Sequence, residues 1–337
     1  MDDIAQLLAE TLDRLLDEHC TGRRIREIEA GEPAETLWSL IEESGFADAL
    51  LPETNGGAGL DLAQTYPLFE LCGRHAVPVP LAQTMVARAA LAAAGVSPPP
   101  GSIAIGRATQ DGYGAIHAPA VSFGQVADWA LVALGDAAVL LRVEVRDRHV
   151  FPLDASLSWQ AAALTGAAAL PIGGTLLELE ACLASAQLAG AMARIFEQTL
   201  DYANGRQQFG RPIGKFQTVQ HQLSVMAELV FASRMAAQLG CRASSDERFA
   251  LAVAAAKART SEAALEVATI AHAVHGAIGF TAELDLQLFT RRLHAGRLSA
   301  GSESFWHDRL GKTLIAEWHG PCLDMIQAIT RQEGDAR

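Results

Sequence analysis

The chain has 337 residues, half of them apolar, with a formal net charge of -13 and a pI near 5.2. This length is enough for two or three domains or one large helical one, and the apolar share is enough to bury a sizeable core. Because an acidic chain without a basic stripe cannot neutralise phosphates, we expect no nucleic-acid partner.

The cysteines and the N-terminus indicate a cellular compartment. Five widely spaced cysteines without a Cys-x-x-Cys pair are typical of a reducing environment and give no metal knuckle. The acidic start Met1-Asp-Asp-Ile4 lacks a basic, apolar signal sequence, and no uncharged apolar run reaches 18 residues with membrane character. We therefore expect a cytoplasmic chain without membrane insertion.

Residues 1–97 are predicted to form an N-terminal helical domain. One apolar stripe is formed by Ile4, Leu7, Leu8, Leu12, Leu15 and Leu16. A second helix ends at Gly45, and a third begins near Leu62 after the flexible turn Asn55–Gly59. The turn lacks the Lys-Ser/Thr that would follow in a phosphate-binding P-loop, so it is interpreted as a connection.

Residues 98–170 are predicted to form a reduced middle β-domain. Pro98-Pro-Pro-Gly101 is a linker, and short runs of β-like composition follow it. They are Ser102–Ile105, Trp129–Leu134, Ala138–Val143 and His149–Phe151. Their spacing predicts a small antiparallel sheet or a sandwich.

Residues 171–337 are predicted to be a C-terminal helical bundle. One helix is expected to end near Asn204-Gly205 and the next to begin near Phe216, because Gly205, Gly210 and Pro212 interrupt the pattern. The loop between them carries Arg206, Gln208 and Arg211 around one aromatic residue, Phe209. Two interpretations are open from the residues alone: an anion clamp, or an ordinary charged connection between helices.

Histidines give no metal site. The ten are scattered, and although His272 and His275 share a helix face, no nearby carboxylate supplies a third ligand. We predict no bound metal.

Three segments together resemble the acyl-CoA dehydrogenase family. The most specific is Arg206-Gln-Gln-Phe-Gly-Arg-Pro-Ile-Gly-Lys-Phe-Gln-Thr-Val-Gln220, which is similar to the signature loop of that family. His275-Gly-Ala-Ile-Gly-Phe-Thr-Ala-Glu283 resembles its Gly-Gly-x-Gly-Phe segment, and Pro52–Leu60 resembles its N-terminal Gly-rich turn. The three occur in family order. The resemblance implies an α+β, mainly α fold with N-terminal helices, a small middle β-domain and a C-terminal four-helix bundle.

The resemblance also implies an activity and its cofactor. Members use FAD to oxidise an acyl-CoA thioester to the 2,3-enoyl-CoA: a carboxylate removes the α-proton, and the β-hydrogen leaves as hydride. An electron-transfer flavoprotein is the expected electron acceptor. A base of this kind requires a dry pocket, where burial raises the pKa of a carboxylate.

The usual base is missing from this chain. An ungapped count from Phe280 puts Ala300 at the position of the family's Glu. Some members carry the base near the start of the helix that leads into the signature loop, and the same kind of count from Phe209 puts Glu180 there. Glu180 is therefore the candidate catalytic residue. The alternative is that Glu178 and Glu180 both lie in the first turn of a helix, where the helix dipole favours carboxylates. Glu303 ranks below it because it is three residues out of register.

The cofactor contacts implied by the resemblance come from three places. They are Arg206, Gln208, Phe209, Gln217, His275, Gly276, Gly279 and Ser302. Gly276 and Gly279 have an alternative explanation as close helix-packing positions. Glu180 and Arg206 are 26 positions apart, which is about 39 Å if all is helix. Since an extended FAD is shorter, the arginine is expected to reach a flavin held mainly by a neighbouring subunit, in a homo-oligomer or a heteromer.

The middle region departs from the family. The Thr-Glu-Pro-x-x-Gly-Ser and Trp-x-Thr/Ser segments that bind the flavin ring are absent from residues 98–135. This leaves an alternative function, in which the chain is a non-catalytic partner that completes the flavin site of a longer homologue. A flavin oxidase or monooxygenase on the same fold is a lesser alternative.

Overall fold

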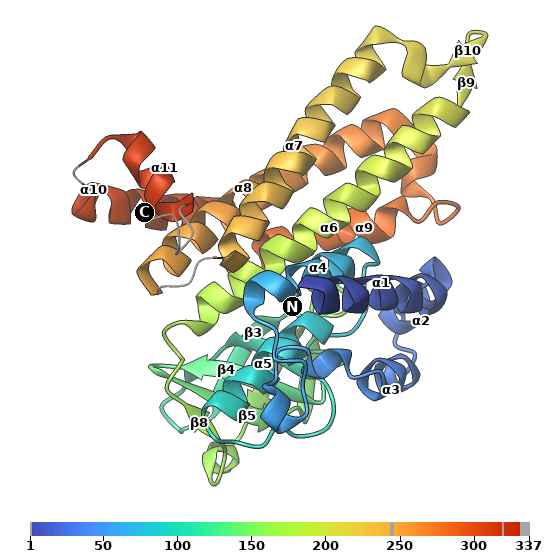
Figure 1. Ribbon diagram of the computed structural model, residues 1–337. Helices are drawn as coiled ribbons and strands as arrows, with labels where there is room; N and C mark the ends of the chain where they lie inside the picture. The colour runs from blue at the N-terminus through green and yellow to red at the C-terminus, as the bar shows by residue number, and fades with distance from the viewer. Residues whose placement is uncertain (1, 243–245, 319, 331–337) are drawn as a thin grey trace. The chain divides into compact units, whose positions relative to one another are not determined.

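The computed structural model describes residues 2–242, 246–318 and 320–330 (Figure 1). The chain forms two compact units, residues 1–183 and 184–337, and helix α6 (Leu176–Gly205) contains the boundary between them. The expected fold class is confirmed: the protein is mainly helical, with a β-region in the middle and a helical C-terminal part. The three-domain division at residues 97 and 170 stays a prediction.

The first unit begins with five helices. They are α1 (Asp2–His19), α2 (Gly22–Glu29), α3 (Glu35–Glu43), α4 (Leu62–Arg74) and α5 (Leu81–Ala93). Helix α4 begins where expected because Asp61 and Gln64 form a reciprocal capping box. The stripe predicted for α1 is only partly right: Leu12 and Leu16 are fully buried, whereas Ile4 and Leu7 are exposed.

Two four-stranded sheets follow. The first has the order β1 (Ile103–Arg107), β4 (Trp129–Leu134), β5 (Ala137–Arg142) and β8 (Ala169–Leu170). The second has the order β2 (Thr109–Gln110), β3 (Ile116–Val121), β7 (Ala155–Trp159) and β6 (Val145–Arg148). Residues from both sheets share one apolar cluster, as in a sandwich. Of the two predicted arrangements, the sandwich agrees with these sheets, whereas a purely antiparallel sheet is wrong because β1 pairs with β4 in parallel. The prediction of a strand at His149–Phe151 is also wrong.

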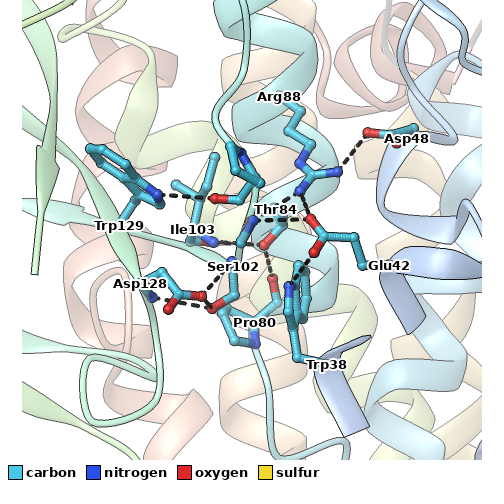
Figure 2. A network of polar contacts seen from close by, with 12 residues as sticks. Trp38, Glu42, Asp48, Pro80, Thr84, Arg88, Ser102, Ile103, Asp128 and Trp129 are labelled. Carbon is cyan, nitrogen blue, oxygen red and sulfur yellow. Dashed lines mark hydrogen bonds and ion pairs between the residues drawn. The ribbon is translucent and has the colours of Figure 1, made fainter. Parts of the chain in front are cut away.

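A polar network ties the helices of this unit to its first strand (Figure 2). Arg88 of α5 is buried and forms ion pairs with Glu42 of α3 and with Asp48, the latter at 2.8 Å. It also donates to the carbonyl of Gly101 at 3.1 Å. Glu42 in turn accepts from the Gly101 amide at 3.0 Å and from the Trp38 indole at 3.1 Å. The Pro-rich linker before β1 is thus fixed by a buried cation.

The second unit is a helical bundle. Besides most of α6 it contains α7 (Gln217–Arg242), α8 (Asp246–His275), α9 (Leu286–Leu298), α10 (Glu303–Glu317) and α11 (Cys322–Thr330). Helix α8 packs against α7, α9 and α10. By length and hydropathy alone, Leu176–Gly205 and Arg248–Phe280 could cross a membrane, but 78% and 50% of their most apolar windows are buried inside the protein. Core helices of soluble bundles pass the same test.

Candidate functional site

The signature loop forms a short arm between α6 and α7 (Figure 1). Helix α6 ends at Gly205, and β9 (Gln207–Gln208) pairs with β10 (Arg211–Pro212) in a hairpin. The base of the arm is closed by two backbone hydrogen bonds, from the Arg206 amide to Tyr202 and from the Ile213 amide to Arg206, each 2.8 Å. The expected helix ends are therefore correct, and the loop between them is an ordered turn.

The tip of the arm displays an aromatic ring to solvent. Phe209 is 92% exposed and adopts a left-handed backbone conformation with φ of +52°. Its ring meets that of Phe216 edge-on at 6.2 Å, and the guanidinium of Arg211 lies 4.3 Å from the centre of the Phe216 ring. A large apolar side chain held in a strained conformation away from any core is typical of a binding element.

The polar residues predicted for the cofactor lie beside this ring. Arg206 and Gln208 are exposed on the hairpin, and Gln217 is exposed at the start of α7. A guanidinium and two amides supply donors for a phosphate, and a bare phenyl ring supplies a stacking surface. The residues of the arm fit part of a dinucleotide such as FAD.

The second predicted motif lies next to the arm. The ring of His275, at the end of α8, stacks on Tyr202 of α6 with ring centres 4.4 Å apart. The Tyr202 hydroxyl donates to the His275 carbonyl at 3.4 Å. The backbone carbonyl of Tyr202 accepts from the Arg206 amide, so this residue meets the arm through its backbone and the His275 motif through its side chain. The structure thus brings together His275 and Arg206, which are far apart in the sequence.

The glycines of the second motif differ in role. Gly276 has a φ of +64° and open space where a side chain would point, which suits a close approach of backbone to a ligand. Gly279 is buried, and a Cβ there would lie 3.0 Å from the Cβ of His275 and 3.3 Å from Nδ1 of His272. Packing therefore accounts for Gly279, whereas Gly276 stays a candidate cofactor contact.

His272 is a residue that sequence reasoning considered only as a metal ligand. Its ring stacks on Phe280 with ring centres 4.2 Å apart, and Nε2 lies 3.0 Å from Oγ1 of Thr290. Its Nδ1 is buried without a hydrogen-bond partner. Burial lowers the pKa of both His272 and His275, so both rings are neutral near pH 7. Among the described residues no cluster of three potential metal ligands occurs.

Ser302 lies on a separate part of the bundle. It is the N-cap residue of α10, on the turn that follows α9, and its side chain makes no capping hydrogen bond. Lys257 of α8 binds this turn, and 18 positions separate Lys257 from His275 at the end of the same helix. That spacing corresponds to about 27 Å along α8. Ser302 and the arm therefore do not line the same small site.

Ala300 occupies the same turn. It is buried and left-handed, with a φ of +53°, and its carbonyl accepts from the Trp306 indole at 2.9 Å. No carboxylate therefore stands at this position. The carboxylate of Glu303, on the next helix, forms an ion pair with Arg297.

Glu180 lies near the start of α6. The helix begins at Leu176, so Glu178 is in the first turn and Glu180 is beyond it. Glu178 is 4% exposed, whereas Glu180 is half-buried. The helix dipole acts mainly on the first turn, which makes it a weaker explanation for Glu180 than the sequence suggested.

Comparisons with known proteins agree with this architecture. Residues 172–315 match the family description "Acyl-CoA dehydrogenase, C-terminal domain". Acyl-CoA dehydrogenase IpdE2 of Mycolicibacterium smegmatis is 31% identical over 300 residues, which cover 87% of this chain and 93% of that protein. The chain belongs to the acyl-CoA dehydrogenase family. Members of this family are FAD-dependent oxidoreductases.

Solved structures of family members share the fold. The ChsE4-ChsE5 complex from Mycobacterium tuberculosis superposes with a TM-score of 0.81 at 21% identity, covering 94% of this chain and 98% of that one. A variant of the Tcur3481-Tcur3483 steroid acyl-CoA dehydrogenase gives a TM-score of 0.76 at 26% identity, with the same coverage. Each of these two proteins is named for two different chains.

Proposed function

We propose that this chain is a subunit of an FAD-dependent acyl-CoA dehydrogenase that converts an acyl-CoA thioester to the 2,3-enoyl-CoA. The observation that carries the proposal is the exposed arm. It displays Phe209 and Arg206 away from the core, next to the His275–Gly276 corner. Such an arm suits a flavin dinucleotide whose other contacts come from a second subunit.

The residues of the chain have separate tasks in this proposal. Arg206 binds the pyrophosphate, Gln208 and Gln217 supply amide groups, Phe209 stacks on a ring, and the backbone at His275 and Gly276 approaches the adenosine side. When bound, FAD accepts the hydride that leaves the β-carbon. Ser302, next to the turn that Lys257 binds from the middle of α8, contacts a different flavin or a different part of the same one.

Glu180 is the proposed base. It would accept the α-proton of the thioester, whose acidity rises when the carbonyl oxygen accepts hydrogen bonds. Two observations support Glu180 over other carboxylates. Ala300 stands where most family members carry the base, and Glu303 is three residues away from that position. Glu180 lies beyond the first turn of α6, so the helix dipole is a weaker explanation for a carboxylate there.

A second function competes with the first. The chain would be a non-catalytic partner whose arm completes the flavin site of a longer homologue. Ala300 and the missing ring-binding segments of the middle domain favour it. The two-chain composition named for the similar ChsE4-ChsE5 and Tcur3481-Tcur3483 proteins supports a heteromer in either case. We further propose a cytoplasmic location and an electron-transfer flavoprotein as electron acceptor.

Anaerobic reduction of the flavin distinguishes the two functions. The chain is purified alone and together with a longer acyl-CoA dehydrogenase homologue as candidate partner. Flavin absorbance is followed after addition of straight-chain and steroid side-chain CoA thioesters. With Glu180 as base, Glu180→Gln slows bleaching by about 10²- to 10⁴-fold. Glu178→Gln, a change at the neighbouring carboxylate of the same helix, is the matched control.

Each outcome has a defined meaning. Fast bleaching in Glu180→Gln, with activity dependent on the partner, would assign the base to the partner and support the second function. Absence of flavin from every preparation would contradict both functions.

A further inference from the structure

Lys257 is a fully buried lysine in the middle of α8. Lysine is almost never fully buried, because an ammonium group that leaves water must recover its hydrogen bonds within the protein. It is flanked by small apolar residues, Ala256 and Ala258, which are also buried. A lysine on such a buried apolar helix face does not stabilise the fold unless its ammonium group forms specific hydrogen bonds.

The ammonium has three acceptors in a defined arrangement. Nζ donates to Oγ of Ser261 at 2.7 Å, to the carbonyl of Gly301 at 2.9 Å and to the carbonyl of Arg297 at 3.1 Å. Three acceptors match the three N–H groups of an ammonium. The Arg297 carbonyl belongs to the last turn of α9, where the helix dipole favours a cation. Lys257 therefore links the last turn of α9 to Gly301 in the turn Ser299–Ser302.

The clamped turn has a strained backbone. Ala300 and Gly301 are consecutive left-handed residues, with φ of +53° and +96°. Such a conformation costs energy for alanine and persists only where the surroundings enforce it. Here the Trp306 indole holds the Ala300 carbonyl at 2.9 Å, and a Cβ on Gly301 would lie only 2.7 Å from the Phe305 ring.

A charge pair completes the clamp. Glu303, the first residue of α10, forms an ion pair with Arg297. Burial raises the pKa of Glu303, but the hydrogen bond from Arg297 and the nearby charges of Arg297 and Lys257 outweigh it and keep that pKa below its ordinary value. The carboxylate is therefore ionised at neutral pH and holds the start of α10 against the end of α9. Strain enforced by this many contacts is a feature of ligand sites.

We propose that Lys257 is a positioning residue: it holds the turn Ser299–Ser302 in the shape that contacts the flavin. The inference rests on the proposed function and deepens it, because it names the group that sets one wall of the cofactor site. Lys257 itself acts through the carbonyls of Arg297 and Gly301. Ser302, which follows the clamp and makes no capping hydrogen bond, is the side chain presented to the ligand.

The test compares Lys257→Met with Lys312→Met in the full chain, alone and with its partner. Met keeps an apolar stem of similar length but has no donors, and Lys312 is a 75% exposed lysine that pairs with Asp308 on α10. Three quantities are measured: the melting temperature, the hydrogen-exchange rate of amides 299–303, and the dissociation constant of added FAD. Ser261→Ala removes one acceptor of Lys257 and the weak hydrogen bond of 3.4 Å from Ser261 to the Arg297 carbonyl, but leaves both bonds from Lys257 to the carbonyls of Arg297 and Gly301. It serves as the variant that folds if Lys257→Met does not.

Lys257→Met is expected to raise exchange in the turn and to weaken FAD binding, each by about tenfold, while the arm exchanges as in wild type. Ser261→Ala should change both quantities in the same direction by a smaller factor, and Lys312→Met should change neither. A lower melting temperature with unchanged FAD affinity, or unchanged exchange at 299–303, would overturn the inference and leave the proposed function standing. Wild type that binds no FAD, alone or with its partner, would instead overturn the proposed function, and the positioning role with it.

Discussion

Replacement of Arg88 by methionine tests the polar network of the first unit. Arg88 is 4% exposed and binds Glu42, Asp48 and the Gly101 carbonyl. Methionine fills most of the volume but removes every donor. Loss of one partner from a buried ion pair costs about 3–5 kcal/mol. Because the two carboxylates are each 30% exposed and water can solvate them afterwards, we expect the lower end, about 3 kcal/mol.

Thermal unfolding followed by circular dichroism measures this loss. For a unit of 183 residues, about 3 kcal/mol lowers the melting temperature by about 6–12 °C. Arg23→Met is the matched control, because the Arg23 side chain is 88% exposed and its ion pair with Glu27 contributes little. A fall of less than about 2 °C for Arg88→Met, or an equal fall in the control, would refute the reasoning.

The same variant has a pH signature. Burial raises the pKa of Glu42, but the bonds from the Gly101 amide, Arg88 and Trp38 outweigh it, so the folded pKa lies below the ordinary value. The stabilisation from this depressed pKa is complete above the ordinary glutamate pKa of about 4.3 and is lost as pH falls through the folded pKa. The difference in melting temperature between wild type and Arg88→Met should therefore shrink below about pH 4. A difference that is constant from pH 7 to pH 3 would contradict the role of Glu42.

Three further predictions concern single side chains. The Cys72 thiol, whose pKa burial raises to about 12, should resist iodoacetamide at pH 8 in the folded protein and react after denaturation; mass spectrometry that finds it alkylated in the native state would contradict this. Phe209→Ala should weaken FAD binding by about five- to tenfold without a change in melting temperature, because the ring is exposed; equal affinity by fluorescence titration would remove it from the cofactor site. Gly279→Ala should destabilise the protein by about 1–3 kcal/mol in urea unfolding, because the new methyl group would lie 3.0 Å from the Cβ of His275. An unchanged urea midpoint would show that the backbone around Gly279 can move to accommodate the methyl group.

Local signals were sufficient for much of the fold. Gly205, Gly210 and Pro212 set the helix ends around the arm through backbone conformations that each residue type favours by itself. The start of α4 was predictable for the same reason, since its cap uses residues three positions apart. The predicted strands 129–134 and 138–143 correspond closely to β4 and β5.

Non-local features were out of reach of the sequence pattern. The parallel pairing of β1 with β4 depends on register between segments, which composition does not encode. Arg88 meets Glu42 and Asp48 from 46 and 40 positions away, so no local window contains the network. Lys257 was missed because α8 looks like a plain Ala-rich helix; its acceptors lie 40 and 44 positions further on, in α9 and the turn after it.

Part of the candidate site was predictable because its residues are neighbours in the sequence. Arg206 and Phe209 belong to one contiguous motif and fold into one arm. The stack between Tyr202 and His275 needed the three-dimensional structure, since the two rings come from different helices. Ser302, separated from His275 by most of α8, shows that a set of residues derived from motifs need not converge on one place.

A structure of the FAD-loaded assembly, with this chain and its partner, tests the central claim most directly. The account predicts that Arg206 and Phe209 of this chain contact the pyrophosphate and a ring of a flavin whose other contacts come from a second subunit. An arm whose Arg206 points into bulk solvent, remote from every subunit boundary and every flavin, would contradict it.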